Sequence, residues 1–179
     1  QMINFPVAGG TSGHLVGGTL AAILLGPWAA VIVMTCVVAV QGLIFQDGGL
    51  IVMGFNLLNM AVISPFVGYA VYTWIRKAVT HPNGGWLAGT AVGAWASVVA
   101  AALACALELA ISGTSAFGVV VPAMFGIHVL IGLGEALITV GALAFIRQTR
   151  PDLTDPQTPA PARGSNWITI GLVVALVLT

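Results

Sequence analysis

The chain alternates long apolar runs with short polar connections, the pattern of a protein whose helices cross a membrane. A helix that spans the hydrocarbon core needs roughly 20 apolar residues. Four runs reach this length, a fifth is shorter, and a last one is only long enough for part of a span. In chain order, the predicted elements are residues 15–26, 28–45, 51–75, 86–111, 117–146 and the partial run 167–178.

The first predicted span is short, because twelve residues of helix cover only about 18 Å. It fits either a re-entrant half-helix or a short span whose outer end unwinds into the preceding glycines. We favour the short span, since it makes the topology alternate in agreement with the charges. Irregular helices are expected elsewhere: Pro65 predicts a kink or break, and Pro122 and Gly126 interrupt the last long run.

Composition supports a membrane protein and excludes a nucleic-acid binder. Charged residues make up 6% of the chain and apolar residues 59%, and the mean hydropathy is +1.06; soluble domains average roughly 25% charged residues. The net charge is zero and no basic patch is present. The two cysteines stand alone in apolar runs, which predicts buried apolar side chains and no disulfide. The chain begins at Gln1 and ends within an apolar run, so we expect it to be part of a longer protein.

The basic residues predict the orientation in the membrane. All five lie in two connections, residues 76–85 and 147–165. The positive-inside rule places both in the cytoplasm, and residues 46–50 and 112–118 outside. A Pro-rich cytoplasmic linker, residues 149–166, then joins a membrane bundle of residues 1–148 to the start of a second hydrophobic unit at residues 167–179.

Residues 9–18, GGTSGHLVGG, hold the strongest candidate for a functional group, His14. Glycine permits positive φ and close approach of other segments, and histidine is the commonest metal ligand among side chains. Irregular backbone at membrane depth is tolerated only where protein buries it or a water-filled cavity adjoins it. The segment is therefore predicted to line a site near the outer face. A simple interhelical turn, with the histidine capping a helix end, remains the alternative.

Several other polar side chains fall within or at the edges of the predicted spans. Ionisable groups there cost roughly 2.5–3.5 kcal/mol and usually mark function or a buried pair. Asn56 and Asn59 share one helix face just below an outer connection, and Gln41 lies at a similar depth on the preceding helix. These amides are predicted to orient a ligand or a backbone segment in the cavity of His14. The residues concerned are Gln41, Asn56, Asn59, Glu108, His128 and Glu135.

His128 and Glu135 lie seven residues apart and share a helix face, but they are too far apart to hold one ion. His128 is nearer the outer end and could reach the cavity. Glu135 lies near the middle of its span, and we expect it to be neutral or hydrogen-bonded to a neighbouring helix. Plain interhelical hydrogen bonding is the alternative for both residues.

No nucleotide-binding motif or catalytic constellation is evident, so no ATPase activity is expected from this chain. Ser12 lies beside His14 but has no third triad member in its neighbourhood. An intramembrane hydrolase of the rhomboid type would need a serine and a histidine that meet across helices, and His128 is formally available for that.

Five motifs, in chain order, resemble the CbiM/NikM family: GGTSGHLVGG, LLGPWAAVIVM, QGLIFQDGG, GFNLLNMAVISP and HVLIGLGEALIT. Together they cover almost all of residues 1–147. The family comprises the substrate-capturing membrane components of energy-coupling factor (ECF) transporters for cobalt and nickel. The resemblance implies an all-α, polytopic transmembrane helix bundle like the ECF S components. It also implies that residues 1–148 are the last five of seven helices.

The resemblance further implies that Co²⁺ or Ni²⁺ is captured outside a bacterial or archaeal cell membrane, in some organisms for cobalamin biosynthesis. A transmembrane coupling protein and two cytoplasmic ATPases then drive release. The family binds its ion through an N-terminal Met-His and a hinge histidine, whose position His14 occupies. Three of the four nitrogen ligands are then expected upstream of Gln1, and Ser12, Gln41, Asn56, Asn59 and His128 would support the site. Residues 167–179 resemble the start of a fused auxiliary component.

Two other functions stay open at this stage. One is an S component that binds an organic vitamin, against which the scarcity of aromatic residues in the connections counts. The other is a membrane scaffold or hydrolase without a transport role. The sequence does not distinguish cobalt from nickel, because both ions accept nitrogen ligands.

Overall fold

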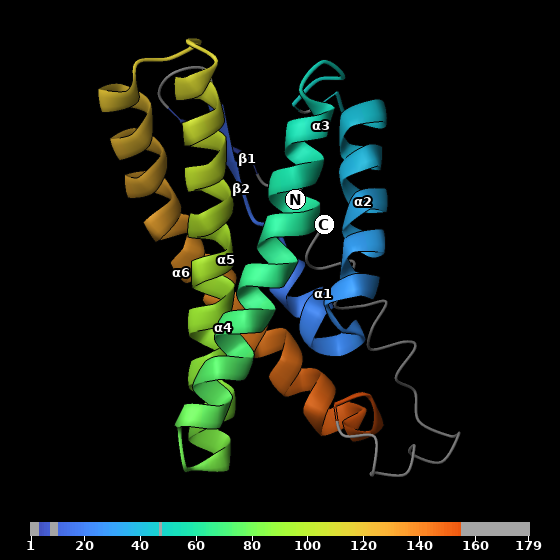
Figure 1. The fold of residues 1–179 in the computed structure, drawn as a ribbon. Coiled ribbons are helices and arrows are strands. Elements are labelled where there is room, and N and C mark those ends of the chain that lie inside the picture. Colours follow the sequence, from blue (N-terminus) through green and yellow to red (C-terminus); the bar gives the residue numbers. More distant parts are fainter. Residues whose placement is uncertain (1–3, 8–10, 47, 155–179) are drawn as a thin grey trace. The chain divides into compact units, whose positions relative to one another are not determined.

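A computed structural model describes residues 4–7, 11–46 and 48–154 (Figure 1). The chain divides into two compact units, residues 1–140 and 141–179. Within the second unit, Arg150 contacts Asp152 through two hydrogen bonds of 2.9 and 2.8 Å, which lower the pKa of the Asp152 carboxyl. Most of the predicted linker and the predicted auxiliary segment lie outside the described residues.

Four helices in the described part of the chain are long and apolar enough to cross a membrane, so the predicted multi-pass helix bundle is confirmed. They correspond to the four long runs of the sequence. One of them changes helix type twice along its length, as α3, the π-helix η1 and α4. The elements are α2 (Pro27–Ile44), α3 (Met53–Asn56), η1 (Leu57–Ile63), α4 (Ser64–Ala78), α5 (Pro82–Ile111) and α6 (Phe117–Thr149).

The first predicted span is present only as a short helix, α1 (Gly18–Leu25). Eight residues give about 12 Å of helix, less than half of the hydrocarbon core. Gly26, with φ +83°, ends α1, and Pro27 then begins α2. The element therefore has the length of a half-helix rather than that of the short span favoured from the sequence.

The irregularity expected at Pro65 takes the form of a π-helix. Pro65 is the second residue of α4, just after η1 ends at Ile63, and it lacks the N–H that an α-helix would donate to the preceding turn. The wider π-helical turn accommodates this loss without ending the helix. Pro122 and Gly126, in contrast, do not interrupt α6, which is helical through both.

A short β-hairpin, which the sequence analysis did not predict, lies beside the helices (Figure 1). Strand β1 (Asn4–Val7) pairs antiparallel with β2 (Thr11–His14), and His14 lies opposite Asn4. The glycine-rich segment was expected to be irregular, because glycine has low strand propensity. Its backbone nevertheless pairs with the strand that precedes it, so His14 ends a strand.

Small residues bring α1, α4 and α5 into close contact. A Cβ atom on Gly93 would lie 2.7 Å from the carbonyl oxygen of Gly68, and a Cβ on Gly68 would overlap the side chain of Thr19. Thr19 also donates a hydrogen bond of 3.4 Å to the Gly93 carbonyl. Such contacts replace the hydrophobic driving force that lipid does not supply.

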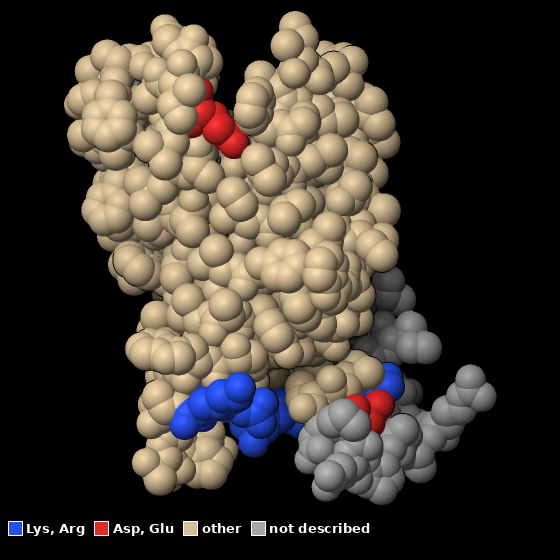
Figure 2. Space-filling model, viewed as in Figure 1, with Lys and Arg blue, Asp and Glu red and all other residues tan. Residues whose placement is uncertain are grey.

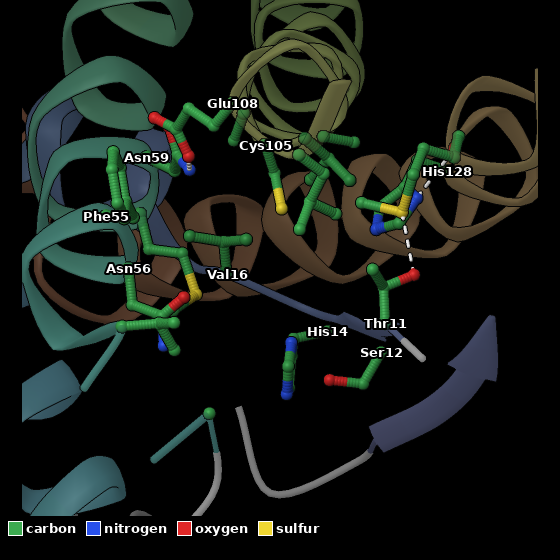
Figure 3. Close-up of a pocket in the computed structure, with 18 of the residues that line it drawn as sticks. Thr11, Ser12, His14, Val16, Phe55, Asn56, Asn59, Cys105, Glu108 and His128 are labelled. Carbon is green, nitrogen blue, oxygen red and sulfur yellow. Dashed lines mark hydrogen bonds between the residues drawn. The ribbon is translucent and has the colours of Figure 1, made fainter. Parts of the chain in front are cut away.

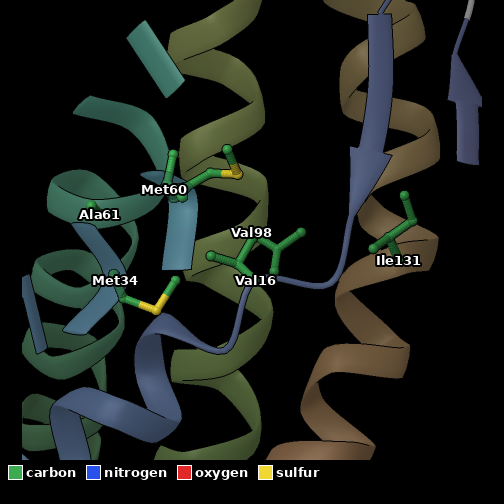
Figure 4. Packing of buried hydrophobic residues seen from close by; sticks show 7 residues of the cluster. Val16, Met34, Met60, Ala61, Val98 and Ile131 are labelled. Carbon is green, nitrogen blue, oxygen red and sulfur yellow. The ribbon is translucent and has the colours of Figure 1, made fainter. Parts of the chain in front are cut away.

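An apolar cluster packs the segment before α1 against α2, η1, α5 and α6 (Figure 4). Val16, in the segment between β2 and α1, lies among side chains from α2, η1, α5 and α6. The cluster consists of Val16, Met34, Val38, Met60, Ala61, Val98 and Ile131, all less than 10% exposed. The segment that carries His14 is therefore anchored at its C-terminal side by the bundle core.

Gly93→Ala is expected to destabilise the protein by about 1–3 kcal/mol, because the added methyl group overpacks the α4–α5 contact. Gly126→Ala is a matched control in α6, since its Cβ would meet nothing within 4 Å; there the higher helix propensity of alanine should leave stability unchanged or slightly raised. Thermal unfolding midpoints in detergent test this. Equal unfolding midpoints for the two variants would show that α4 and α5 can move apart without loss of stability.

Candidate functional site

A cavity of about 400 Å³ lies between the hairpin and the helices α3, η1, α5 and α6 (Figure 3). Its wall is largely apolar, with polar side chains from each of these elements. Those polar residues, with two from the connection after α5, are Thr11, Ser12, His14, Asn56, Asn59, Glu108, Ser112, Thr114 and His128. The cavity thus contains the histidine, both asparagines and the serine that the sequence analysis had singled out.

His14 reaches the cavity because its strand packs tightly against α6. A Cβ atom on the preceding Gly13 would collide with Ile131 and would lie 3.2 Å from Nε2 of His128. Only glycine lets the backbone approach this closely. The half-buried His14 side chain lies along the cavity wall, with Thr11 and Ser12 of the same strand beside it in Figure 3.

Glu135 holds the segment that follows His14. One carboxylate oxygen accepts a hydrogen bond of 2.9 Å from the Val16 N–H, and the other accepts one of 2.7 Å from the Gly17 N–H. Glu135 is 3% exposed, and Gly17 has φ +80° directly before α1. The sequence analysis expected Glu135 to form a hydrogen bond with a neighbouring helix. In the structure its partners are instead the backbone N–H groups immediately before α1. A carboxylate at a helix N-terminus also complements the helix dipole. We refer to these two hydrogen bonds as the Glu135 clamp.

His128 lies at the cavity, as its position near the end of the helix predicted, and is 5% exposed. Its Nδ1 lies 2.7 Å from the carbonyl oxygen of Met124. A carbonyl only accepts hydrogen bonds, so Nδ1 carries the proton and a neutral ring leaves Nε2 as an acceptor. Met124 also accepts a 3.1 Å contact from the Thr11 hydroxyl at its sulfur atom, which joins β2 to α6 (dashed in Figure 3).

Asn59 and Glu108 form a polar pair across the cavity wall. Asn59 Nδ2 donates a hydrogen bond of 2.8 Å to Glu108 Oε2 and so links η1 to α5. Asn56 also lines the cavity, whereas Gln41 is buried away from it. Glu108, Cys105, Thr11 and Met124 were not predicted as site residues. The spacing of three between Cys105 and Glu108 places them on one helix face, but the sequence does not reveal which face borders a cavity.

Figure 2 shows where charged groups lie on one face of the molecule. Acidic atoms lie in a notch at the top of this view. The basic residues Arg76 and Lys77 belong to the last turn of α4, whose end lies at the bottom of Figure 1. Within residues 4–7, 11–46 and 48–154, no group of three His, Cys, Asp or Glu side chains is close enough to hold a metal ion. His14 and His128 therefore contribute to the cavity without forming a complete metal centre among the described residues.

Comparison with known proteins gives a consistent result. Residues 1–153 match the family model described as "CbiM: Cobalt uptake substrate-specific transmembrane region". A putative fused nickel transport protein, NikMN, of Archaeoglobus fulgidus is 38% identical over 99% of this chain, which spans 57% of that protein's length. A putative metal transport protein of Haloquadratum walsbyi is 41% identical over 88% of this chain and 70% of its own length.

Solved structures are similar as well. A crystal structure of a truncated transition metal transporter superposes with a TM-score of 0.75 at 36% identity, covering 82% of this chain and 73% of that one. A second crystal structure of a transition metal transporter gives a TM-score of 0.74 at 35% identity. The bundle is therefore similar to experimentally determined ones over most of its length.

Proposed function

This chain belongs to the CbiM family of cobalt uptake substrate-specific transmembrane regions, and we propose that it forms part of the component that captures Co²⁺ or Ni²⁺ for an ECF-type transporter. The observation that carries the proposal is the placement of His14 on a cavity wall by two independent devices. Gly13 packs its strand against α6, and the Glu135 clamp holds the segment that follows. A ligand that must select a metal by geometry needs such support on both sides.

The metal ion is the cargo, and His14 supplies one nitrogen ligand to it from this chain. The other ligands that the family resemblance implies, an N-terminal amine, a backbone nitrogen and a second imidazole, would lie outside residues 1–179. A planar set of nitrogen ligands suits Ni²⁺ well and Co²⁺ acceptably. Ser12, Asn56, Asn59 and His128 line the same cavity and would contact these ligands or the water that accompanies the ion.

Transport requires partners, which we propose to be a transmembrane coupling protein and two cytoplasmic ATPases. In this arrangement the basic end of α4, with Arg76 and Lys77, faces the cytoplasm, and the cavity opens to the outside. Release of the ion would follow when the strand that carries His14 moves away from its partner ligands. Residues 167–179 would begin a fused auxiliary segment, in line with the fused names of two relatives.

Uptake of radioactive cobalt or nickel by cells tests this function. Cells that express the full-length protein together with its coupling protein and ATPases should accumulate the ion from submicromolar concentrations. Cells that carry an ATPase variant unable to hydrolyse ATP should not. Accumulation that is equal in the two strains, or binding of an organic vitamin by the purified protein in the absence of metal, would contradict the proposal.

A further inference from the structure

The pair of Asn59 and Glu108 lines one cavity and leaves one buried oxygen atom without a partner. Asn59 is 4% exposed and lies in the π-helix η1; its Nδ2 donates to Glu108, but its Oδ1 has no hydrogen-bond partner within the described residues. Buried amide oxygens nearly always have a partner, and exceptions point to function or to an unseen ligand. Single π-helical turns are also frequent at functional sites.

Among the acidic side chains that the structure describes, Glu108 is the one that pairs with neither a basic side chain nor a backbone N–H. Glu135 accepts two backbone N–H groups, and Asp152 pairs with Arg150. Glu108 accepts only the amide of Asn59. It lies near the end of a membrane-spanning helix and lines the cavity that also contains His14. The partly exposed Glu108 carboxylate therefore presents its charge to the cavity, with no counter-ion among the described residues.

We propose that Glu108 and Asn59 form a receiving site, at which a hydrated divalent transition metal ion binds through oxygen atoms before it passes to His14. The ligand chemistry fits: carboxylate, amide carbonyl and water oxygens bind such ions weakly enough for transfer to nitrogen ligands. One negative charge in a low-dielectric cavity also attracts cations from solution and accelerates their association. This inference rests on the proposed function of His14.

An ordinary interhelical hydrogen bond is the competing explanation, and it accounts for the contact between Nδ2 and Oε2. It does not account for a buried amide oxygen without a partner, or for a carboxylate without a counter-ion, in the wall of one cavity. A cation bound at Glu108 would supply the missing counter-ion. The receiving site therefore explains features that a purely structural contact leaves unexplained.

The test measures Co²⁺ association with the full-length protein by stopped-flow spectroscopy at several ionic strengths. Glu108→Gln keeps an acceptor for Asn59 but removes the charge, so the association rate constant should fall at least about tenfold and lose most of its salt dependence. The dissociation rate constant should stay the same. Glu108→Asp should retain the salt dependence. Ser112→Ala is the control, because Ser112 lines the cavity but its hydroxyl already bonds to Leu109 and Thr114.

A second measurement uses the His14→Ala background, in which tight binding is expected to be lost. Equilibrium dialysis should then detect one weakly bound Co²⁺ per protein, and the added Glu108→Gln substitution should remove it. An unchanged association rate constant in Glu108→Gln, or weak binding that persists in the double variant, overturns the receiving site. If instead His14→Ala alone leaves tight binding intact, the proposed function fails and not merely this inference.

Discussion

Replacing His14 with alanine is expected to lower the affinity of the full-length protein for Co²⁺ and Ni²⁺ by about 100-fold or more. Loss of a residue that only supports a metal ligand typically costs about 10- to 100-fold in affinity, and His14 is proposed to be a ligand itself. Because the variant removes a half-buried side chain at a cavity wall, the fold should persist. Isothermal titration of the purified protein measures the affinity, and radioactive cobalt accumulation in cells measures the consequence for uptake.

His81→Ala is the matched control for this experiment. His81 precedes α5, where its Nδ1 accepts a hydrogen bond of 3.2 Å from the Gly84 N–H, and it does not line the cavity. Its removal should weaken the start of α5 slightly and leave metal affinity unchanged. If the two histidine variants bind metal equally well, His14 is not a ligand.

The second large effect is expected from Glu135→Leu, which removes both acceptors of the Glu135 clamp. Two backbone N–H groups, one buried and one partly buried, would lose their partners, at a cost of up to about 1–3 kcal/mol each. The segment between His14 and α1 should loosen, so that metal affinity falls together with the thermal unfolding midpoint. Glu135→Gln retains one carbonyl acceptor and should lie between the wild type and Glu135→Leu in both measurements.

Glu108→Gln provides the matched control for stability, since it makes the same chemical change in another membrane-spanning helix. Its amide oxygen can still accept the Asn59 hydrogen bond, so the unfolding midpoint should change little. Glu135→Gln should lower the midpoint clearly more. If the Glu135 clamp does not stabilise the fold, Glu108→Gln and Glu135→Gln should have equal unfolding midpoints.

The helices were predictable because membrane insertion depends on apolar length, which is a local property of the chain. The four long runs of the sequence correspond to α2, the helix from α3 to α4, α5 and α6. The irregularity near Pro65 was predictable for the same reason, because proline alters the hydrogen bonds of its own helix. The sequence did not predict that this irregularity is a π-helix that carries Asn59, because the helix type depends on how the helix packs against α2 and α5.

The candidate site was predictable only in part. The glycines around His14 indicated a segment that other parts of the chain approach closely, and Gly13 does pack against His128 and Ile131. The hairpin was missed because a glycine-rich strand has no alternating pattern, and pairing with residues 4–7 supplies its order. Glu135 was expected to bond to a helix, whereas it bonds to the backbone at Val16 and Gly17.

The sequence by itself determined that this chain is a membrane-spanning helix bundle and that His14 stands at an exceptional position in it. Apolar length and glycine content suffice for both conclusions, because each acts within a few neighbouring residues. Only the tertiary structure decided which polar groups meet: the Glu135 clamp joins residues more than a hundred positions apart, and Asn59 reaches Glu108 across two helices. Such pairings depend on how the helices are rotated and packed against one another, which periodicity along one chain does not specify.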